Sequence, residues 1–273
     1  GCAWFDFDND GLIDLYVANN GLNDLYKNVG NGKFEIVEDV IPVTEEGNSF
    51  GCSTADYNND GFIDLFVANW WGKNHLYKNL GNGQFEKIKD SPVTDESLNS
   101  EGSSWGDFDN DGDLDLIVTN DGDNSLFEND NGFFSKLEHI SPASDSSNSN
   151  GVTWNDFDND GHLDIFIANG GNQPNLLYRN PGNNNNWLKI KCVGTVSNRS
   201  AIGAKVTIFQ NKKRIAREVT GQTGGGYGGQ NGLVLHFGLG QGKADSVIVS
   251  WLSGKKSKML SPKINRTHTI IES

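Results

Sequence analysis

An acidic nine-residue motif, Asp-x-[Asp/Asn]-x-Asp-Gly-x-x-Asp, occurs four times in this 273-residue chain. The copies are Asp6–Asp14, Asp56–Asp64, Asp107–Asp115 and Asp156–Asp164. Their central glycines are 50, 51 and 49 residues apart, and an apolar segment ending in Asn follows each copy. Repetition at periods of roughly 20–50 residues indicates similar units that bury their faces only by stacking on one another. The first part of the chain is therefore an array.

Each repeat contains more than its acidic loop. A Leu-aromatic pair follows the apolar segment, as at Leu25–Tyr26, and the first three repeats continue with an Asn-Gly turn and a Phe, as at Asn31–Gly32 and Phe34. Asn-Gly between alternating apolar residues favours a hairpin, and aromatic and β-branched residues favour strands. About four short strands per unit are typical of a β-propeller blade. We expect units at about residues 1–48, 49–99, 100–148 and 149–181.

The acidic loop predicts a metal site. Side-chain oxygens lie at loop positions 1, 3, 5 and 9, a glycine stands at position 6, and the position-7 carbonyl is expected to point inward. Ca²⁺ accepts about six to eight such hard oxygen ligands, whereas Mg²⁺ keeps more water and Zn²⁺ prefers His or Cys. The candidate ligands are Asp6, Asp8, Asp10, Leu12 and Asp14; Asp56, Asn58, Asp60, Phe62 and Asp64; Asp107, Asp109, Asp111, Asp113 and Asp115; and Asp156, Asp158, Asp160, His162 and Asp164.

Clustered Asp and Asn also form plain polar turns. That alternative explains one such loop more easily than four in register, because four or five carboxylates per loop repel one another without a cation. Asn58 replaces one carboxylate, which predicts that the second site is the weakest. An EF-hand is excluded, since its position-12 Glu is replaced here by Val17, Val67, Val118 or Ile167 within an apolar strand.

On these residues the sequence resembles the FG-GAP/VCBS repeat family over residues 1–181. The resemblance lies in the four DxDxDGxxD-like loops and in the flanking WxDFD and DLyVAN segments. It implies propeller blades that carry about four Ca²⁺ sites between paired strands. It also implies a ring of more blades than these four repeats supply.

Residues 186–273 differ in kind. Short alternating runs broken by Gly predict a β-sandwich or barrel. This part resembles the ASPIC/UnbV domain at Trp187–Val193, Ile202–Val206, His236–Gly240 and Val249–Gly254, although Leu252 replaces a usual proline and Gly226–Gln230 is richer in glycine than usual. The order of repeats and ASPIC/UnbV domain is that of the cartilage acidic protein family. It implies extracellular adhesive or matrix roles without established catalytic residues.

The charge is divided between the two parts. Residues 1–186 carry a net charge of −25 and residues 187–273 carry +11, which indicates two modules. The acidic part argues against nucleic-acid partners. The basic charges are scattered between apolar strand residues, so we expect a solvated surface there. No stretch approaches the roughly 18 apolar residues of a membrane span.

Three motifs resemble catalytic signatures, but we expect each of them to have a structural role. Gly47–Gly51 matches a nucleophile elbow around Ser49, but Asn-Ser-x-Gly recurs at the start of other repeats, which indicates a turn. Gly224-x-Gly226-x-x-Gly229 leads into a strand and not into a helix, so it is a glycine loop. His236 lies between apolar residues and is expected to be a satisfied core histidine.

Cysteine and tryptophan residues yield structural expectations. Cys2, Cys52 and Cys192 are expected to be small buried residues without disulfides. Trp4, Trp105 and Trp154 share one repeat position and are expected to pack between blades. Trp70–Trp71 have no counterparts, and a sugar- or protein-contact patch and local packing are both open for them.

We therefore predict a secreted, calcium-binding, non-enzymatic protein of adhesion, matrix or surface assembly, with protein or glycan partners. The alternative is an accessory or catalytic module for extracellular polysaccharide, which needs carboxylates outside the calcium loops. The fourth repeat lacks the segment that follows the Asn-Gly turn elsewhere. We expect either more chain upstream or completion by neighbouring chains through open strand edges.

Overall fold

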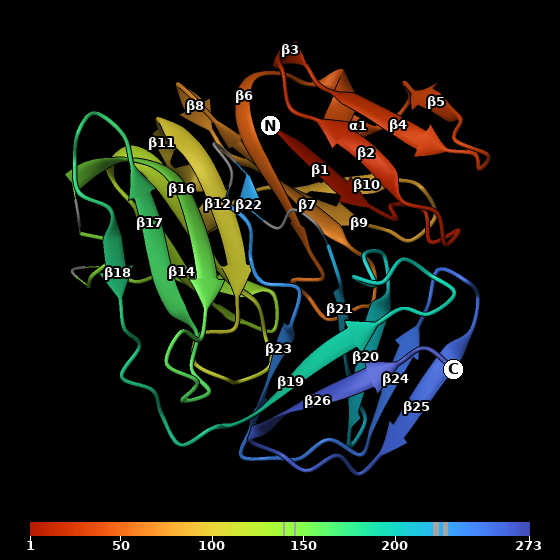
Figure 1. Ribbon diagram of the computed structural model, residues 1–273. Coiled ribbons are helices and arrows are strands. Elements are labelled where there is room, and N and C mark those ends of the chain that lie inside the picture. Colours follow the sequence, from red (N-terminus) through yellow and green to blue (C-terminus); the bar gives the residue numbers. More distant parts are fainter. Residues whose placement is uncertain (139, 145, 221–223, 226–228) are drawn as a thin grey trace.

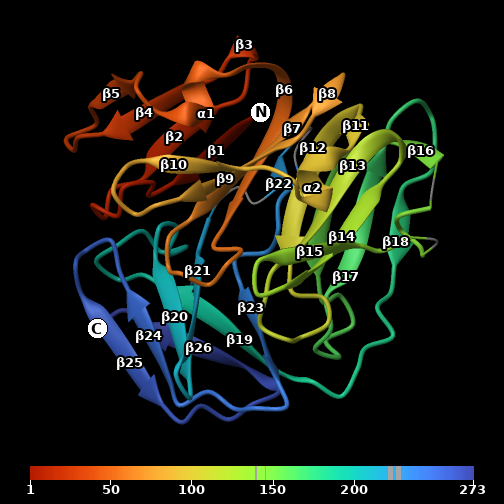
Figure 2. The same ribbon diagram turned by 180° about the vertical axis from the view of Figure 1, so that it is seen from behind.

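The four repeats fold into antiparallel blades that stand side by side in an arc, and residues 186–273 form two sheets below them (Figure 1; Figure 2). The computed structural model describes residues 1–138, 140–144, 146–220, 224–225 and 229–273. Strands make up nearly all of its regular structure. The predicted class, all-β with propeller blades and a C-terminal sandwich, is confirmed.

The strands of each blade pair in chain order. The first blade contains β1 (Cys2–Phe5), β2 (Asp14–Val17), β4 (Asp24–Asn28) and β5 (Phe34–Val37). The second contains β6 (Glu46–Ala55), β7 (Asp64–Asn69), β9 (His75–Asn79) and β10 (Phe85–Ile88). The third contains β12 (Ser100–Gly106), β13 (Asp115–Asp123), β14 (Ser125–Asp130) and β15 (Phe133–Lys136). The fourth contains β16 (Ser146–Asn155), β17 (Asp164–Asn169) and β18 (Leu176–Tyr178). Every acidic loop joins the first two strands of its blade.

Short pairings join consecutive blades. β3 (Asn20–Leu22) pairs with the start of β6, and β8 (Gly72–Lys73) pairs with β11 (Ser97–Leu98). The end of β13 pairs with the start of β16 in the same way. Two helical turns, α1 (Ile41–Thr44) and α2 (Pro92–Asp95), precede β6 and β11. Their four-residue length is too short to give a helical period, so the sequence did not predict them.

The hydrophobic core of the array lies between neighbouring blades, where three clusters of buried residues alternate with the sheets. Trp105 stacks on Tyr57 of the preceding repeat, and Trp154 stacks on Phe108 with centroids 6.2 Å apart. These two residues confirm the predicted packing between blades. Trp4 is 39 % exposed and contacts Phe34 of its own repeat, so the prediction is wrong for it.

The outer face of the fourth blade is open. Phe166 and Leu177 are 40 % and 55 % exposed, whereas their counterparts in the other repeats are at most 2 % exposed. Those counterparts are Tyr16, Phe66 and Ile117 for Phe166, and Leu25, Leu76 and Leu126 for Leu177. The fourth blade also has three strands among the described residues. An apolar face of the kind that is buried elsewhere in the array is thus left at the surface.

The C-terminal part is a sandwich of two sheets around one core. One sheet has the order β23 (Leu235–Gly240), β19 (Asn186–Val193) and β26 (Arg266–Ile271), with β19 and β26 parallel. The other has the order β21 (Lys213–Glu218), β20 (Lys205–Gln210), β24 (Ser246–Ser250) and β25 (Lys256–Leu260). Their inward-facing apolar residues form one buried cluster, which includes Phe237 and Trp251.

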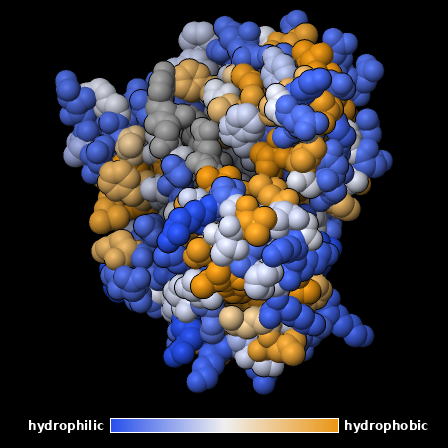
Figure 3. All heavy atoms as spheres, turned by 45° about the vertical axis from the view of Figure 1, so that its right-hand side comes forward, coloured by the Kyte–Doolittle hydropathy of each residue, from blue (hydrophilic) through white to orange (hydrophobic). Residues whose placement is uncertain are grey.

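A segment of the C-terminal part returns to the blades. β22 (Gly224–Gly225) pairs with Ser103 and Ser104 of β12 and also contacts β6 and β16 (Figure 1). On the face shown in Figure 3, hydrophobic residues lie in small groups among hydrophilic ones. Among the described residues, no helix is long and apolar enough to cross a membrane.

Candidate metal centres

Each acidic loop connects two paired strands through a tight backbone path. Phe5 of β1 pairs with Asp14 of β2, and the equivalent residues of the other repeats pair likewise. Loop position 4 is an Asn with a positive φ and position 6 a Gly with a positive φ, as at Asn9 (59°) and Gly11 (88°). The same pair of conformations occurs at Asn59 and Gly61, Asn110 and Gly112, and Asn159 and Gly161. Asn and Gly are the residues that adopt this region most readily.

The side chains at positions 1 and 3 turn back onto the backbone of their own loop. In the first loop the N–H of Gly11 donates to Asp6 Oδ2 at 3.0 Å and the N–H of Asp10 to Asp8 Oδ1 at 3.2 Å. The other loops repeat both bonds. Carboxylate oxygens lie within 4.8 Å of one another in three groups among the described residues: Asp6, Asp8 and Asp10; Asp107, Asp109 and Asp115; and Asp156, Asp158 and Asp164. Asn58 stands at position 3 of the second loop in place of a carboxylate, and the weakness of that site stays a prediction.

The position-9 aspartate anchors each loop to its blade. Asp64 accepts the N–H of Tyr57 at 3.2 Å and of Asn79 at 2.8 Å, one on each oxygen. Asp14, Asp115 and Asp164 accept the equivalent pairs of bonds. All four are at most 2 % exposed. These carboxylates therefore hold the loop in place, and metal ligation by them remains a prediction.

The Asn that binds this aspartate also joins neighbouring repeats. Asn79 Nδ2 donates to the carbonyls of Phe7 and Ile63, at 2.8 and 2.9 Å. Asn129 reaches Tyr57 and Asn180 reaches Phe108 in the same way. The repeated Asn therefore has a physical role: it ties each blade to the loop of the blade before it.

The loops concentrate negative charge without an internal counter-charge of equal size. Burial, ahead of the effect of neighbouring carboxylates, raises the pKa of Asp56 and Asp111 to about 7. Asp56 Oδ1 and Asp156 Oδ1 are buried and have no hydrogen-bond partner among the described residues. A buried carboxylate oxygen without a partner is costly. An all-oxygen donor set with such unsatisfied atoms fits a hard cation such as Ca²⁺.

Basic side chains from the same blades lie against the loops. Lys27 contacts Asp8 and is 3.2 Å from Asp10, and Arg179 Nη2 is 2.8 Å from Asp160. Lys78 lies 3.5 Å from Asp60. These basic side chains offset part of the negative charge of the loops. They are equivalent residues of three repeats.

The sandwich supplies further cations, which sequence reasoning missed. Arg217 of β21 is 2.9 Å from Asp107, Lys213 is 2.7 Å from Asp113, and Lys189 of β19 contacts Asp156. The expectation of a solvated basic surface is therefore wrong for these three residues. The opposite net charges of the two parts were the signal that could have predicted this interface.

The sandwich backbone also touches the third loop directly. The N–H of Gly238 donates to Asp107 Oδ2 at 2.7 Å, and the N–H of Gly240 donates to the Asn110 carbonyl at 2.8 Å. A Cβ on Gly238 would lie 2.3 Å from the Asn110 backbone. The close approach explains why glycine stands at this position of the strand.

The residues of the motifs that resemble catalytic signatures make structural contacts where the structure describes them. Ser49 Oγ of β6 donates to Asn69 Oδ1 of β7 at 3.0 Å, and Ser100 and Ser149 make the equivalent bond. The recurring Ser therefore lies in a strand, next to an irregularity in the strand register, and the predicted turn is wrong. His236 is buried as expected but lies at the interface, where Nε2 is 2.6 Å from Asn110 Oδ1. The glycine loop at 224–229 falls partly outside the described residues, as do most positions of the 226–230 segment.

The cysteine and tryptophan predictions are confirmed for some residues and not for others. Cys52 and Cys192 are buried free thiols as expected, whereas Cys2 is half-buried. Trp70 packs against Phe50, and Trp71 is 77 % exposed with a φ of 59°. Trp70 thus follows the local-packing alternative, while Trp71 stands at the surface. For the position-7 carbonyls of Leu12, Phe62, Asp113 and His162, ligation stays a prediction.

Family models match both parts of the chain. The model of the FG-GAP-like repeat matches residues 6–67, 56–118 and 107–167, and that of ASPIC and UnbV matches residues 194–273. Human cartilage acidic protein 1 (Homo sapiens) is 39 % identical over 84 residues, which are 30 % of this chain and 12 % of that protein. A structure of an Agrocybe aegerita lectin that recognises non-reducing terminal N-acetylglucosamine covers 65 % of this chain and 51 % of its own, with 18 % identity and a TM-score of 0.42. Because the repeat matches together span more than half of its residues, the chain belongs to the FG-GAP-like repeat family and continues into an ASPIC/UnbV domain.

Proposed function

We propose that this chain is a calcium-binding extracellular module of adhesion, matrix or surface assembly, in which Ca²⁺ is structural. The supporting observation is the pair of buried, unpartnered carboxylate oxygens on Asp56 and Asp156, inside loops whose other donors are also oxygen. The residues that would hold the ion are the loop carboxylates and Asn58. The ion would supply positive charge where these side chains converge, with no redox or acid-base chemistry.

The position of the loops supports a structural role. Each loop lies at the contact between two blades or between a blade and the sandwich, as shown by the bonds from Asn79 to Phe7 and from Gly238 to Asp107. A bound cation would therefore stiffen contacts between modules. Extracellular calcium modules of this chemistry bind at about 10⁻⁴–10⁻³ M, a range in which the ion is retained outside cells.

Adhesion and secretion rest on the family and on the exposed surface. The relative cartilage acidic protein 1 is matched over only 12 % of its length, so the activity of such a protein is carried to this chain as a proposal. The open outer face of the fourth blade, with Phe166 and Leu177 exposed, is suited to contact with a protein partner or a second copy. Trp71 adds an exposed aromatic contact on another part of the array.

Calcium titration tests the metal. The chain is stripped with a chelator and its melting temperature is followed during addition of Ca²⁺ or Mg²⁺. We expect a large rise with millimolar Ca²⁺ and a small one with Mg²⁺. Asp111→Asn should weaken the response, and Asp95→Asn, which changes an exposed acid outside the loops, should not. Equal melting temperatures with chelator and with Ca²⁺ would contradict the proposal.

The absence of catalysis needs its own assay. The alternative function, an accessory or catalytic module for polysaccharide, is separated by a hydrolase and lyase screen beside a glycan array. The proposal expects binding without turnover. Release of reducing ends from any polysaccharide by the calcium-loaded chain would replace it with the alternative.

A further inference from the structure

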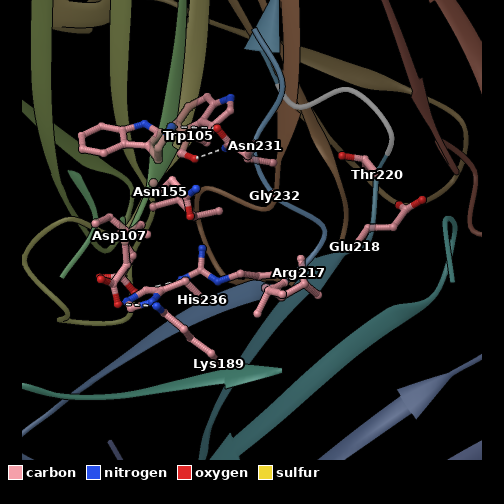
Figure 4. Close-up of a pocket in the computed structure, with 18 of the residues that line it drawn as sticks. Trp105, Asp107, Asn155, Lys189, Arg217, Glu218, Thr220, Asn231, Gly232 and His236 are labelled. Atoms are coloured by element: carbon pink, nitrogen blue, oxygen red, sulfur yellow. Dashed lines mark hydrogen bonds and ion pairs between the residues drawn. The ribbon is translucent and has the colours of Figure 1, made fainter. Parts of the chain in front are cut away.

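A cavity of about 400 Å³ lies where the second, third and fourth blades meet the sandwich. Its lining comes from the ends of β6, β12 and β16 and from β21 and the segment before β23, and Figure 4 shows Arg217 reaching across it toward Asp107. Asn155, Asn159 and Thr267 belong to the lining and are exposed, so the cavity reaches the surface at their side. Its volume falls in the range of about 300–1,000 Å³ that is usual for small-molecule sites.

The cavity gathers unsatisfied polar atoms. Eleven buried side-chain atoms of the described residues have no hydrogen-bond partner, and seven of them belong to residues that line this cavity. Two are the loop oxygens of Asp56 and Asp156, which belong to the metal proposal and are not used for this cavity's occupant. The others are Thr54 Oγ1, Trp105 Nε1, Arg217 Nε, Thr220 Oγ1 and His236 Nδ1, on side chains that are all less than 9 % exposed. Since buried polar groups are almost always bonded, such a concentration indicates an occupant.

The kinds of atom describe that occupant. Trp105 Nε1 and Arg217 Nε can only donate, whereas the hydroxyls of Thr54 and Thr220 can donate or accept. Groups that both donate and accept at one atom, as hydroxyls do, match such a wall. An ammonium group cannot accept from Trp105 and Arg217. A carboxylate could accept from them, but it would face the carboxylates of Asp56 and Glu218 in the same lining.

Four of the six charged side chains of the lining form two ion pairs, and the other two, Asp56 and Glu218, are carboxylates. Arg217 binds Asp107 at 2.9 Å, and Lys189 contacts Asp156. An anion would have to displace the aspartate of one of these buried pairs or face the carboxylates of Asp56 and Glu218. A buried charge that loses its partner is costly. An uncharged ligand leaves both pairs in place.

We propose that this cavity binds an uncharged polyhydroxylated ring, a single sugar residue in size, through Thr54, Thr220, Trp105 and Arg217. The ring is either a free monosaccharide or the terminal residue of a glycan chain that enters past Asn155 and Asn159. Water is the competing occupant, since this volume has room for about a dozen molecules. The cavity borders the metal loops at Asp56, Asp107 and Asp156, but the contacts proposed here come from other side chains.

Isosteric variants test the proposal. Calorimetry in calcium-containing buffer measures the binding of free monosaccharides and methyl glycosides to the full protein chain. A glycan array measures binding to the terminal residues of glycans. We expect one sugar configuration to bind, and Thr54→Val or Thr220→Val to weaken it about tenfold, as expected for one lost hydrogen bond in a buried site. The matched control is Thr119→Val, because Thr119 Oγ1 is also buried and unpartnered but lies outside the cavity.

The calorimetry and the glycan array together distinguish three possible occupants of the cavity. Binding of free sugars assigns a monosaccharide ligand, and binding on the array alone assigns a glycan terminus. No binding in either arm means a water-filled cavity and overturns the proposal. Equal affinity in Thr54→Val, Thr220→Val and wild type, or an equal loss in Thr119→Val, also overturns it. Each variant is first shown to keep the wild-type calcium response, so a failure of the metal proposal is seen separately.

Discussion

Arg217 of the sandwich and Asp107 of the third acidic loop form an ion pair of 2.9 Å, and both side chains are at least 93 % buried. The Asp107 carboxylate also accepts the N–H of Gly238. Removal of the arginine would leave a buried carboxylate without its charge partner, which typically costs about 3–5 kcal/mol.

We therefore expect Arg217→Met to lower the free energy of unfolding by about 3 kcal/mol when calcium is absent. Asp107→Asn together with Arg217→Met should recover part of that loss, because no unpaired charge remains. Urea unfolding of both single variants and the double variant forms the cycle. Additive effects of the two single substitutions would show that the pair is not coupled.

Chelation should lower the melting temperature of the array more than that of the sandwich. A site held at 100 times its dissociation constant adds about 2.7 kcal/mol to the folded state. Asp10→Ala or Asp111→Ala should remove one site, loosen its blade and leave the sandwich intact. Hydrogen exchange resolved by segment measures this difference. Uniform loosening of the whole chain would contradict it.

The side-chain amide of Asn79, which bonds to the preceding repeat, can be compared with that of Asn28, which does not. Asn79→Ala removes bonds to carbonyls of two repeats, whereas Asn28→Ala removes the Nδ2 bond to Ile13 within the first repeat. We expect a loss of about 2–3 kcal/mol for Asn79→Ala and about 1 kcal/mol for Asn28→Ala, because unsatisfied buried carbonyls are costly. Denaturant midpoints compare them. An equal loss in the two variants would show that the bond between blades carries no extra stability.

Glu272 gives the sandwich a defined pH dependence. Burial favours the neutral carboxyl, but hydrogen bonds from the Ser253 hydroxyl and from the N–H groups of Thr195, Ser197 and Val196 outweigh it and lower the pKa of Glu272 to about 2. The ionised form is therefore favoured by folding. Its stabilisation is complete above the ordinary pKa of 4.5 and is lost as the pH falls toward about 2.

We expect the difference in melting temperature between wild type and Glu272→Gln to be largest near neutral pH and to shrink below the ordinary pKa. The comparison of two chains cancels the acid response of the loops, which both share. A difference that does not change with pH would show that the charge of Glu272 is not what stabilises this strand end.

The exposed face of the fourth blade should govern self-association. Leu177→Lys places a charge on a position that is buried in the other repeats, so we expect it to weaken any oligomer in sedimentation velocity. Leu260→Lys is the control, because Leu260 is 68 % exposed on the sandwich and lies outside this face. Identical sedimentation of all three chains at high concentration would exclude the face as a self-association surface.

The blades were predictable from the sequence because their signals are local. The loop, the Asn-Gly turn and the apolar strand all lie within one repeat, and repetition separates them from chance. The contacts of Arg217 and Gly238 with Asp107 could not be predicted, since each joins residues more than 100 positions apart and depends on how the two modules dock. Trp4 shows the same limit: its repeat position predicted burial between blades, but it is 39 % exposed and contacts Phe34 of its own repeat.

The bonds from Asn79 to Phe7, Asn129 to Tyr57 and Asn180 to Phe108 run in one direction along the chain. Each blade holds on to the loop of its predecessor, so order in one loop is a condition for firm attachment of the next repeat. Metal sites linked in this way are not independent. Ion binding to one loop should therefore favour ion binding to the next loop along the chain. Local unfolding should spread from the first repeat toward the later repeats more readily than in the opposite direction.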